Sequence, residues 1–193
     1  SLAERKMIFL DGATGSNLIK EGLTPGVCPE QWILKHPEVL KILQKRYVEG
    51  GSNIIYAPTF GVNKIKLEEY GLYDSMEQMI MDLVQLSKEA SAGKALVAGD
   101  LTMTGKQIAP LGDMDFEELI TVYKEQIQYL VKAGVDLLVV ETMMSLQETR
   151  AAVIAIKEVC ELPILATMTF EKSRRTFVGV SIPAMALTLG SLG

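Results

Sequence analysis

The sequence of 193 residues contains one histidine, two cysteines, and no cluster of lysine and arginine. Its formal net charge of −5 and the lack of a basic patch argue against a nucleic-acid surface. No apolar run approaches the ~20 residues that a membrane-spanning helix needs. Residues 1–11 include a short apolar stretch, but an aspartate follows it and no small-residue cleavage site is present, so we expect no signal peptide.

The scarce residue types carry little catalytic chemistry. Cys28 and Cys160 lie far apart in the sequence, and we interpret them as reduced core thiols of a cytoplasmic protein. His36 precedes a proline at a predicted helix start, which favours packing there over a role as a general base. Most of the ten methionines are interpreted as core filling. Those near strand ends could also line a pocket: Met143, Met144 and Met168.

Short apolar runs alternate along the chain with longer amphipathic stretches. The short runs are continuously apolar, as parallel strands buried on both faces are: Met7–Leu10, Asn53–Ala57, Ala95–Ala98, Val135–Val140 and Pro163–Met168. The longer stretches mostly begin at a capping residue or proline and end at glycine, which predicts helices over Pro37–Gly50, Ser75–Gly93, Asp115–Gly134, Ser145–Cys160 and Ile182–Leu189.

This alternation predicts an α/β fold with a parallel sheet and right-handed crossovers. The length supports one domain over residues 1–193. A full (β/α)₈ barrel takes about 250 residues, so this chain should supply about the first five βα units. We therefore predict a TIM barrel that is truncated and incomplete at its C-terminal end. An open doubly wound sheet is the alternative.

Acidic residues follow two of the predicted strands, at the end where parallel α/β folds place their working residues. Glu141 closes an apolar run, so its carboxylate should be partly desolvated and should need a cation or hydrogen-bond donors. The cation could be a neighbouring lysine or arginine, or the ammonium group of a substrate. Asp11 is either an ordinary turn aspartate or a second acceptor for the same ammonium.

Small residues after Asp11 leave the backbone N–H groups approachable. Gly12 and Ala13 could form a nest for a substrate carboxylate, which together with the two acids describes an amino-acid site. The segment lacks the third glycine of a dinucleotide fingerprint and the Gly-Lys-Ser/Thr of a P-loop. Thr59 and Phe60 follow the second predicted strand and complete the predicted substrate-binding set.

An ordered set of segments resembles the homocysteine S-methyltransferase family, and most closely the homocysteine-binding modules of cobalamin-dependent methionine synthases. The segments are Leu10–Ser16, Pro29–Trp32, Tyr47–Ile55, Thr59–Gly61, Gly99–Asp100, Thr104–Gly105 and Glu141–Thr142. The resemblance implies a (β/α)₈ barrel in which Asp11 and Glu141 bind the amino group of homocysteine. Backbone amides after Asp11 would bind its carboxylate.

The resemblance also implies a chemistry. Family members hold zinc with three cysteine thiolates, and this zinc converts the homocysteine thiol into a thiolate at neutral pH. The thiolate takes a methyl group and becomes methionine. In methionine synthases the donor is methylcobalamin, recharged from 5-methyltetrahydrofolate, so pterin-binding and corrinoid-binding domains are the implied partners.

The zinc cysteines of the family follow strands six and eight of the barrel, which we expect beyond Gly193. The 193 residues should then bind no metal, contain no catalytic residue and be inactive alone. The rim of the site departs from the family pattern at Ala57-Pro58, where asparagine is common. It departs again at Met143-Met144-Ser145, which replaces Phe-Ser-Asp.

Two alternatives remain open from the sequence. One keeps the family but uses S-methylmethionine or betaine as the methyl donor, without cobalamin. The other is a non-catalytic half-barrel that serves as a binding or assembly module and has no affinity for amino acids.

Overall fold

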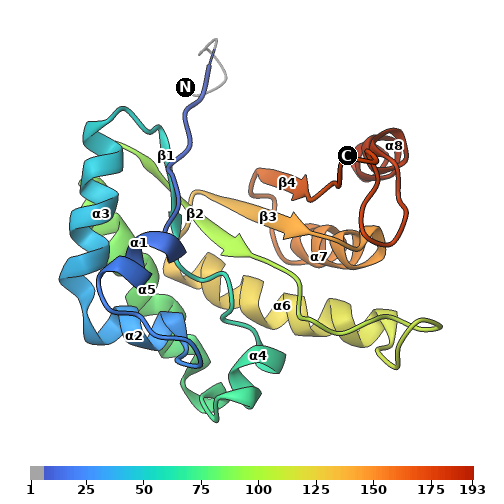
Figure 1. Ribbon diagram of the computed structural model, residues 1–193, viewed down its shortest axis with the longest axis horizontal. Helices are drawn as coiled ribbons and strands as arrows, with labels where there is room; N and C mark the ends of the chain where they lie inside the picture. The colour runs from blue at the N-terminus through green and yellow to red at the C-terminus, as the bar shows by residue number, and fades with distance from the viewer. Residues whose placement is uncertain (1–6) are drawn as a thin grey trace.

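A four-stranded parallel sheet lies at the centre of the computed structural model, which describes residues 7–193 (Figure 1). Its strands are β1 (Ile54–Ala57), β2 (Leu96–Leu101), β3 (Leu137–Met143) and β4 (Ile164–Met168). They pair in sequence order, β1-β2-β3-β4. Because the order never reverses, the sheet lacks the switch point of a doubly wound fold, and the barrel-type prediction is the better of the two alternatives.

The first apolar run does not form a strand, so the sheet has four strands where the sequence predicted five. Leu10 makes one isolated parallel bridge to Ile54. The Phe9 carbonyl accepts hydrogen bonds from the backbone N–H groups of Asn53 and Ile54, at 2.7 and 3.3 Å. The Phe9 N–H, in turn, donates to the Asn53 side chain at 3.1 Å. A regular ladder does not extend further, and the side chains from Met7 to Leu10 stay exposed.

The long helices agree with the predicted ranges to within one or two residues at each end. They are α3 (Pro37–Glu49), α5 (Met76–Ser91), α6 (Phe116–Ala133), α7 (Leu146–Val159) and α8 (Ile182–Gly190). The α6 boundaries show why. The Asp115 carboxylate caps its N-terminus by accepting from the N–H groups of Glu117 and Glu118, and Gly134 ends it with a φ of +75°.

Three short helices and one 3₁₀ turn of the structure were not predicted from the sequence. They are α1 (Gly15–Lys20), α2 (Pro29–Lys35), α4 (Lys64–Glu69) and η2 (Tyr73–Ser75). Helices of six or seven residues hold at most about two turns, too few for an apolar period to be visible.

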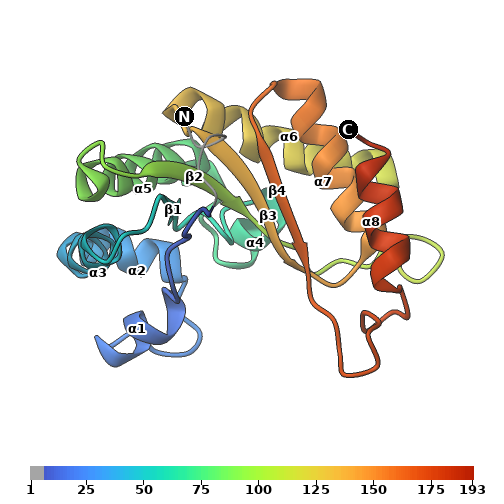
Figure 2. The same cartoon turned by 90° about the horizontal axis from the view of Figure 1, so that it is seen from above.

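The two faces of the sheet are covered differently. Helices α3, α5, α6 and α7 pack on one another in succession and form a curved outer layer beside the strands (Figure 2). Alternate strand residues such as Ile55, Val97 and Leu138 face this layer and form the main core. The residues between them form a smaller cluster on the opposite, inner face: Ile54, Ala98, Leu137 and Val139. Helices on one side of a sequentially ordered parallel sheet are the arrangement of a barrel wall.

Several of the scarce residues lie away from the inner face. Cys28 and Cys160 are both free thiols, the first buried and the second half-buried. His36 stacks on Trp32 with ring centroids 4.2 Å apart, in agreement with a packing role at the start of α3. Within residues 7–193 no helix is both long enough and apolar enough to span a bilayer. The expectation about a signal peptide falls partly on residues 1–6, which lie outside the described residues.

Candidate functional site

The two-residue period of the strands carries polar side chains onto the inner face. Tyr56 lies two residues after Ile54 on β1, Asp100 two after Ala98 on β2, and Glu141 two after Val139 on β3. The sheet register pairs Tyr56 with Ala98, and Asp100 with Val139. Because parallel strands end at the same edge, the three side chains meet near the carboxyl ends of β1, β2 and β3.

The pairing of β3 with β4 is interrupted near the end of β3. The register between β3 and β4 shifts between Val140 and Met143, which brackets Glu141. Thr142 within this bulge has a φ of +59°, a left-handed conformation that β-branched residues rarely adopt. Strained backbone of this kind persists where the surrounding structure enforces it, and it often accompanies functional sites.

The strain at Thr142 predicts an unusual mutational response. Thr142→Asn should raise the free energy of unfolding by about 1 kcal/mol, because asparagine tolerates the left-handed region better. Thr142→Val keeps the β-branched shape and should give no such gain. Urea unfolding curves of both variants measure the difference, and equal stabilities for Asn and Val would contradict the assignment of strain.

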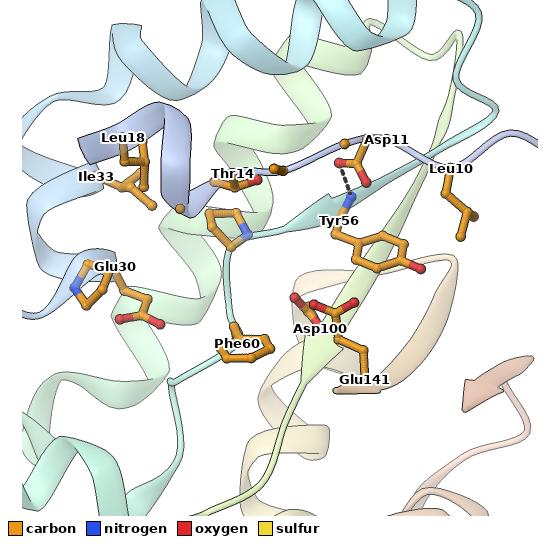
Figure 3. Close-up of a pocket in the computed structure, with 15 residues that line it drawn as sticks. Leu10, Asp11, Thr14, Leu18, Glu30, Ile33, Tyr56, Phe60, Asp100 and Glu141 are labelled. Carbon is orange, nitrogen blue, oxygen red and sulfur yellow. Dashed lines mark hydrogen bonds between the residues drawn. The ribbon is translucent and has the colours of Figure 1, made fainter. Parts of the chain in front are cut away.

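The edge of the sheet opens into a cavity of about 540 Å³ (Figure 3). Five of the six residues predicted to bind substrate line it: Asp11, Gly12, Ala13, Phe60 and Glu141. Thr59 does not line it. Its hydroxyl is buried between strands, where it accepts from the Asp100 N–H at 3.0 Å and donates to the Asp100 carbonyl at 2.9 Å. A role for these residues in binding substrate stays a prediction.

Asp11 is held in place by β1. The backbone N–H of Tyr56 donates to Asp11 Oδ2 at 2.9 Å, the dashed contact in Figure 3. Burial raises the pKa of Asp11 to about 6, and the Glu141 carboxylate adds to the increase. The hydrogen bond from Tyr56 and the N–H of Asp11 itself act in the opposite direction. At neutral pH Asp11 is therefore mostly ionised, with a poorly solvated charge.

The segment after Asp11 packs closely against α3. The Tyr47 hydroxyl donates to the Ala13 carbonyl at 2.8 Å, and Asn17 Nδ2 donates to the same oxygen at 2.6 Å. A Cβ at Gly12 would lie 2.9 Å from the Tyr47 ring, so a larger residue there would require the Tyr47 side chain to shift. The backbone N–H groups of Gly12 and Ala13 donate to no other described residue, which leaves them available to an anion in the cavity.

Glu141 is half-buried, and burial raises its pKa. None of the ion pairs among residues 7–193 involves it, and no lysine, arginine or histidine lines the cavity. The structural alternative for Glu141, a pairing with a neighbouring basic side chain, is therefore absent from the described part of the chain. A ligand cation remains as the partner that a desolvated carboxylate needs.

Two further acids of the cavity were not in the predicted set. Asp100 is 5% exposed, and Glu30 on α2 is 6% exposed. Glu30 is fully engaged, because one oxygen accepts from the Gly61 N–H at 2.8 Å and the other lies 3.3 Å from Cys28 Sγ. Asp100 ends an apolar run, as Glu141 does, so the same signal could have found it. The long-range partner of Glu30 could not be seen in the sequence.

The described residues do not fit a metal ion. Between residues 7 and 193 no group of three or more His, Cys, Asp or Glu side chains is arranged to hold one. Cys28 is engaged with Glu30, and burial raises the pKa of its thiol to about 11, so it is not a thiolate ligand at neutral pH.

The chain is similar in sequence to proteins that act on homocysteine. A family model described as homocysteine S-methyltransferase matches residues 8–192. Methionine synthase of Mycobacterium leprae (strain TN) is 26% identical over 216 residues, covering 100% of this chain and 17% of that protein. Betaine–homocysteine S-methyltransferase 1 of Danio rerio is 31% identical over 167 residues, covering 84% of this chain and 41% of that protein. The chain thus spans less than half the length of either relative.

A solved structure shares the fold. The metallated form of the homocysteine methyltransferase MmuM from Escherichia coli superposes with a TM-score of 0.81 at 20% identity. The match covers 99% of this chain and 73% of that chain. The parallel sheet and its outer helices are therefore arranged as in that larger protein.

Proposed function

Because this chain belongs to the homocysteine S-methyltransferase family, we propose that its cavity binds homocysteine as a methyl acceptor. The observation that carries the proposal is the pair Asp11 and Glu141, two desolvated carboxylates that line one cavity with no basic side chain beside them. A substrate ammonium would supply the missing positive charge through charge-assisted hydrogen bonds.

The same cavity offers a site for the other charged group of an amino acid. The N–H groups of Gly12 and Ala13 are adjacent to Asp11, so a ligand whose ammonium contacts Asp11 can place its carboxylate on them. The carbonyl of Ala13 is already fixed by Tyr47 and Asn17, which holds this backbone in place before the ligand arrives. The side chain of the amino acid is left to extend towards Phe60, where the thiol would lie.

The relatives also support a proposal for the methyl donor and the partners. We propose methylcobalamin as donor, with pterin-binding and corrinoid-binding domains as partners and a zinc-activated thiol. Similarity to methionine synthase along the whole chain supports this choice. Betaine is the alternative, and the relative from Danio rerio supports it. In either case this chain's own residues bind and orient the acceptor.

Titration with L-homocysteine at several pH values tests the proposal. Affinity should fall steeply as the pH drops below 6, because Asp11 must lose its proton to hold the ammonium. Asp11→Asn should bind weakly at every pH while keeping the hydrogen bond from Tyr56. Isothermal calorimetry measures both results.

The desamino analogue 4-sulfanylbutanoate is the control ligand, since it keeps the thiol and carboxylate but lacks the ammonium. Its affinity should not fall on acidification, and Asp11→Asn should not weaken it. No measurable binding of homocysteine between pH 6 and 8 would overturn the proposal.

A further inference from the structure

Asp100 is the most deeply buried acid of the cavity, and it is not satisfied by the protein. Its backbone is fixed on both sides by the Thr59 hydroxyl. Its side-chain Oδ1 has no hydrogen-bond partner among the described residues. Buried polar atoms in folded proteins are nearly always paired, because leaving one unpaired lowers the stability of the fold. An unpaired oxygen in the wall of a cavity therefore points to a missing ligand.

The surroundings of Asp100 are acidic from every side. The acids that face it are Asp11, Glu30 on α2 and Glu141 on β3. Burial raises the pKa of Asp100 well above its ordinary value, and these three carboxylates raise it further. The phenol of Tyr56 on β1 also lies close, but burial raises its pKa to about 12, so it stays neutral. A cation beside Asp100 would therefore favour its ionised state.

The ligand that fits this arrangement is an organic cation. The acids are not arranged to hold a metal ion. Glu30 already accepts from Gly61, which leaves Asp11, Asp100 and Glu141 as the carboxyl groups that a ligand can reach. In Figure 3 Asp100 and Glu141 lie together on one side of the Tyr56 side chain and Asp11 on the other. A primary ammonium has three N–H donors, one for each of these groups.

We propose that Asp100 is a specificity-determining residue of the cavity, which accepts one N–H donor of the substrate's primary ammonium alongside Asp11 and Glu141. The inference rests on the proposed function and deepens it. A secondary amine would leave one carboxyl group unpaired, and a quaternary amine would leave all three unpaired, so the cavity selects an unmodified α-amino group.

The proposal has a second consequence, a release of protons. The pKa of Asp100 is raised in the empty cavity, and an ammonium beside its carboxylate would lower it again, so binding should release protons. Asn at position 100 keeps the size of the side chain but has no proton to release. Proton release on binding therefore reports contact with Asp100, which a purely structural residue would not affect.

Calorimetry at pH 7 in two buffers of different ionisation enthalpy tests these statements on the full 193-residue chain. The ligands are L-homocysteine, N-methyl-L-homocysteine and 4-sulfanylbutanoate. The wild type should bind homocysteine about tenfold or more tightly than the N-methyl compound. Asp100→Asn should lose about tenfold in affinity for homocysteine, lose most of that preference and release fewer protons. Its affinity for 4-sulfanylbutanoate should not change.

The matched control is Asp82→Asn, the same change on an exposed part of α5, which should behave as the wild type does. Melting curves check folding. Asp100→Asn should melt at a higher temperature than the wild type, with a difference that grows from pH 4 towards pH 8, because it removes a carboxyl group that is costly to ionise.

The possible failures are distinguishable. Unchanged homocysteine affinity and proton release in Asp100→Asn would overturn the role of Asp100 and leave the proposed function standing. Equal losses for homocysteine and 4-sulfanylbutanoate would show a structural role, and would also overturn it. A wild type that binds no homocysteine would overturn the proposed function and this inference together.

Discussion

Glu141→Ala should weaken homocysteine binding by about 1.5–3 kcal/mol, roughly 10- to 150-fold, with no loss of stability. The loss follows from removing one charge-assisted hydrogen bond to the ammonium. The fold should survive, because the bond that anchors this position to the neighbouring loop runs from the Thr102 hydroxyl to the Glu141 backbone carbonyl, at 2.9 Å. Titration calorimetry measures the affinity, and a melting curve measures the stability.

Removing this carboxylate also changes its neighbours. Glu141 raises the pKa values of Asp11 and Asp100, so its loss should lower both towards their ordinary range. The acid limit of homocysteine binding should then move below pH 6 in the variant. Glu141→Gln keeps the shape of the side chain but removes its charge, so it should lose nearly as much affinity as Glu141→Ala. Glu161→Ala changes an exposed acid and should leave the affinity unchanged. An unchanged dissociation constant in Glu141→Ala would remove Glu141 from the site.

Glu148→Ala should lower the free energy of unfolding by about 2–5 kcal/mol, the largest stability effect that we expect from a polar residue of this chain. Glu148 is 3% exposed and lies in the first turn of α7. Its Oε1 accepts from the Thr104 N–H at 2.7 Å and from the Thr104 hydroxyl at 2.8 Å, and the Tyr123 hydroxyl lies 3.1 Å away. Alanine would leave the Thr104 N–H and hydroxyl without this acceptor, whereas the Tyr123 hydroxyl could still donate to the Thr102 carbonyl at 3.0 Å.

Chemical denaturation of matched variants measures how much each hydrogen bond of Glu148 contributes to the free energy of unfolding. Glu148→Gln keeps one acceptor oxygen and should cost about half as much, because neutral hydrogen bonds are weaker than those to a carboxylate. Tyr123→Phe removes one donor and should cost about 1 kcal/mol. If Glu148→Ala were as stable as the wild type, the cluster would not contribute to the fold. The cluster also fixes Thr102, and through it the backbone at Glu141.

The sequence predicted best those elements whose signals are local. The helix α6 was predicted from Asp115 to Gly134 because a cap and a left-handed glycine mark its ends within the chain. The run Met7–Leu10 carries the same apolar signal as a strand, yet it forms only a bridge, since pairing depends on the neighbour that the fold provides. No local pattern reports that neighbour.

For the candidate site too, the sequence predicted the residues with local signals and missed those that depend on long-range contacts. Asp11 and Glu141 were predicted because each ends an apolar run, and both line the cavity, although their role in binding substrate stays a prediction. Thr59 was expected beside the substrate by its position, but its hydroxyl is occupied by the backbone of Asp100, 41 residues away. Burial and pairing of this kind decide which of several strand-end residues reaches a cavity, and they arise only when the sheet has formed.

The Asp11 carboxylate has two structural roles because it accepts a hydrogen bond from the Tyr56 backbone. It joins the leading segment of the chain to β1, and it forms part of the cavity wall. A residue at position 11 must accept the hydrogen bond from Tyr56 and must also carry a negative charge into the cavity. A replacement that does only one of these loses the other function. Few side chains satisfy both, so substitutions of Asp11 are restricted for two separate reasons, the junction and the charge of the cavity.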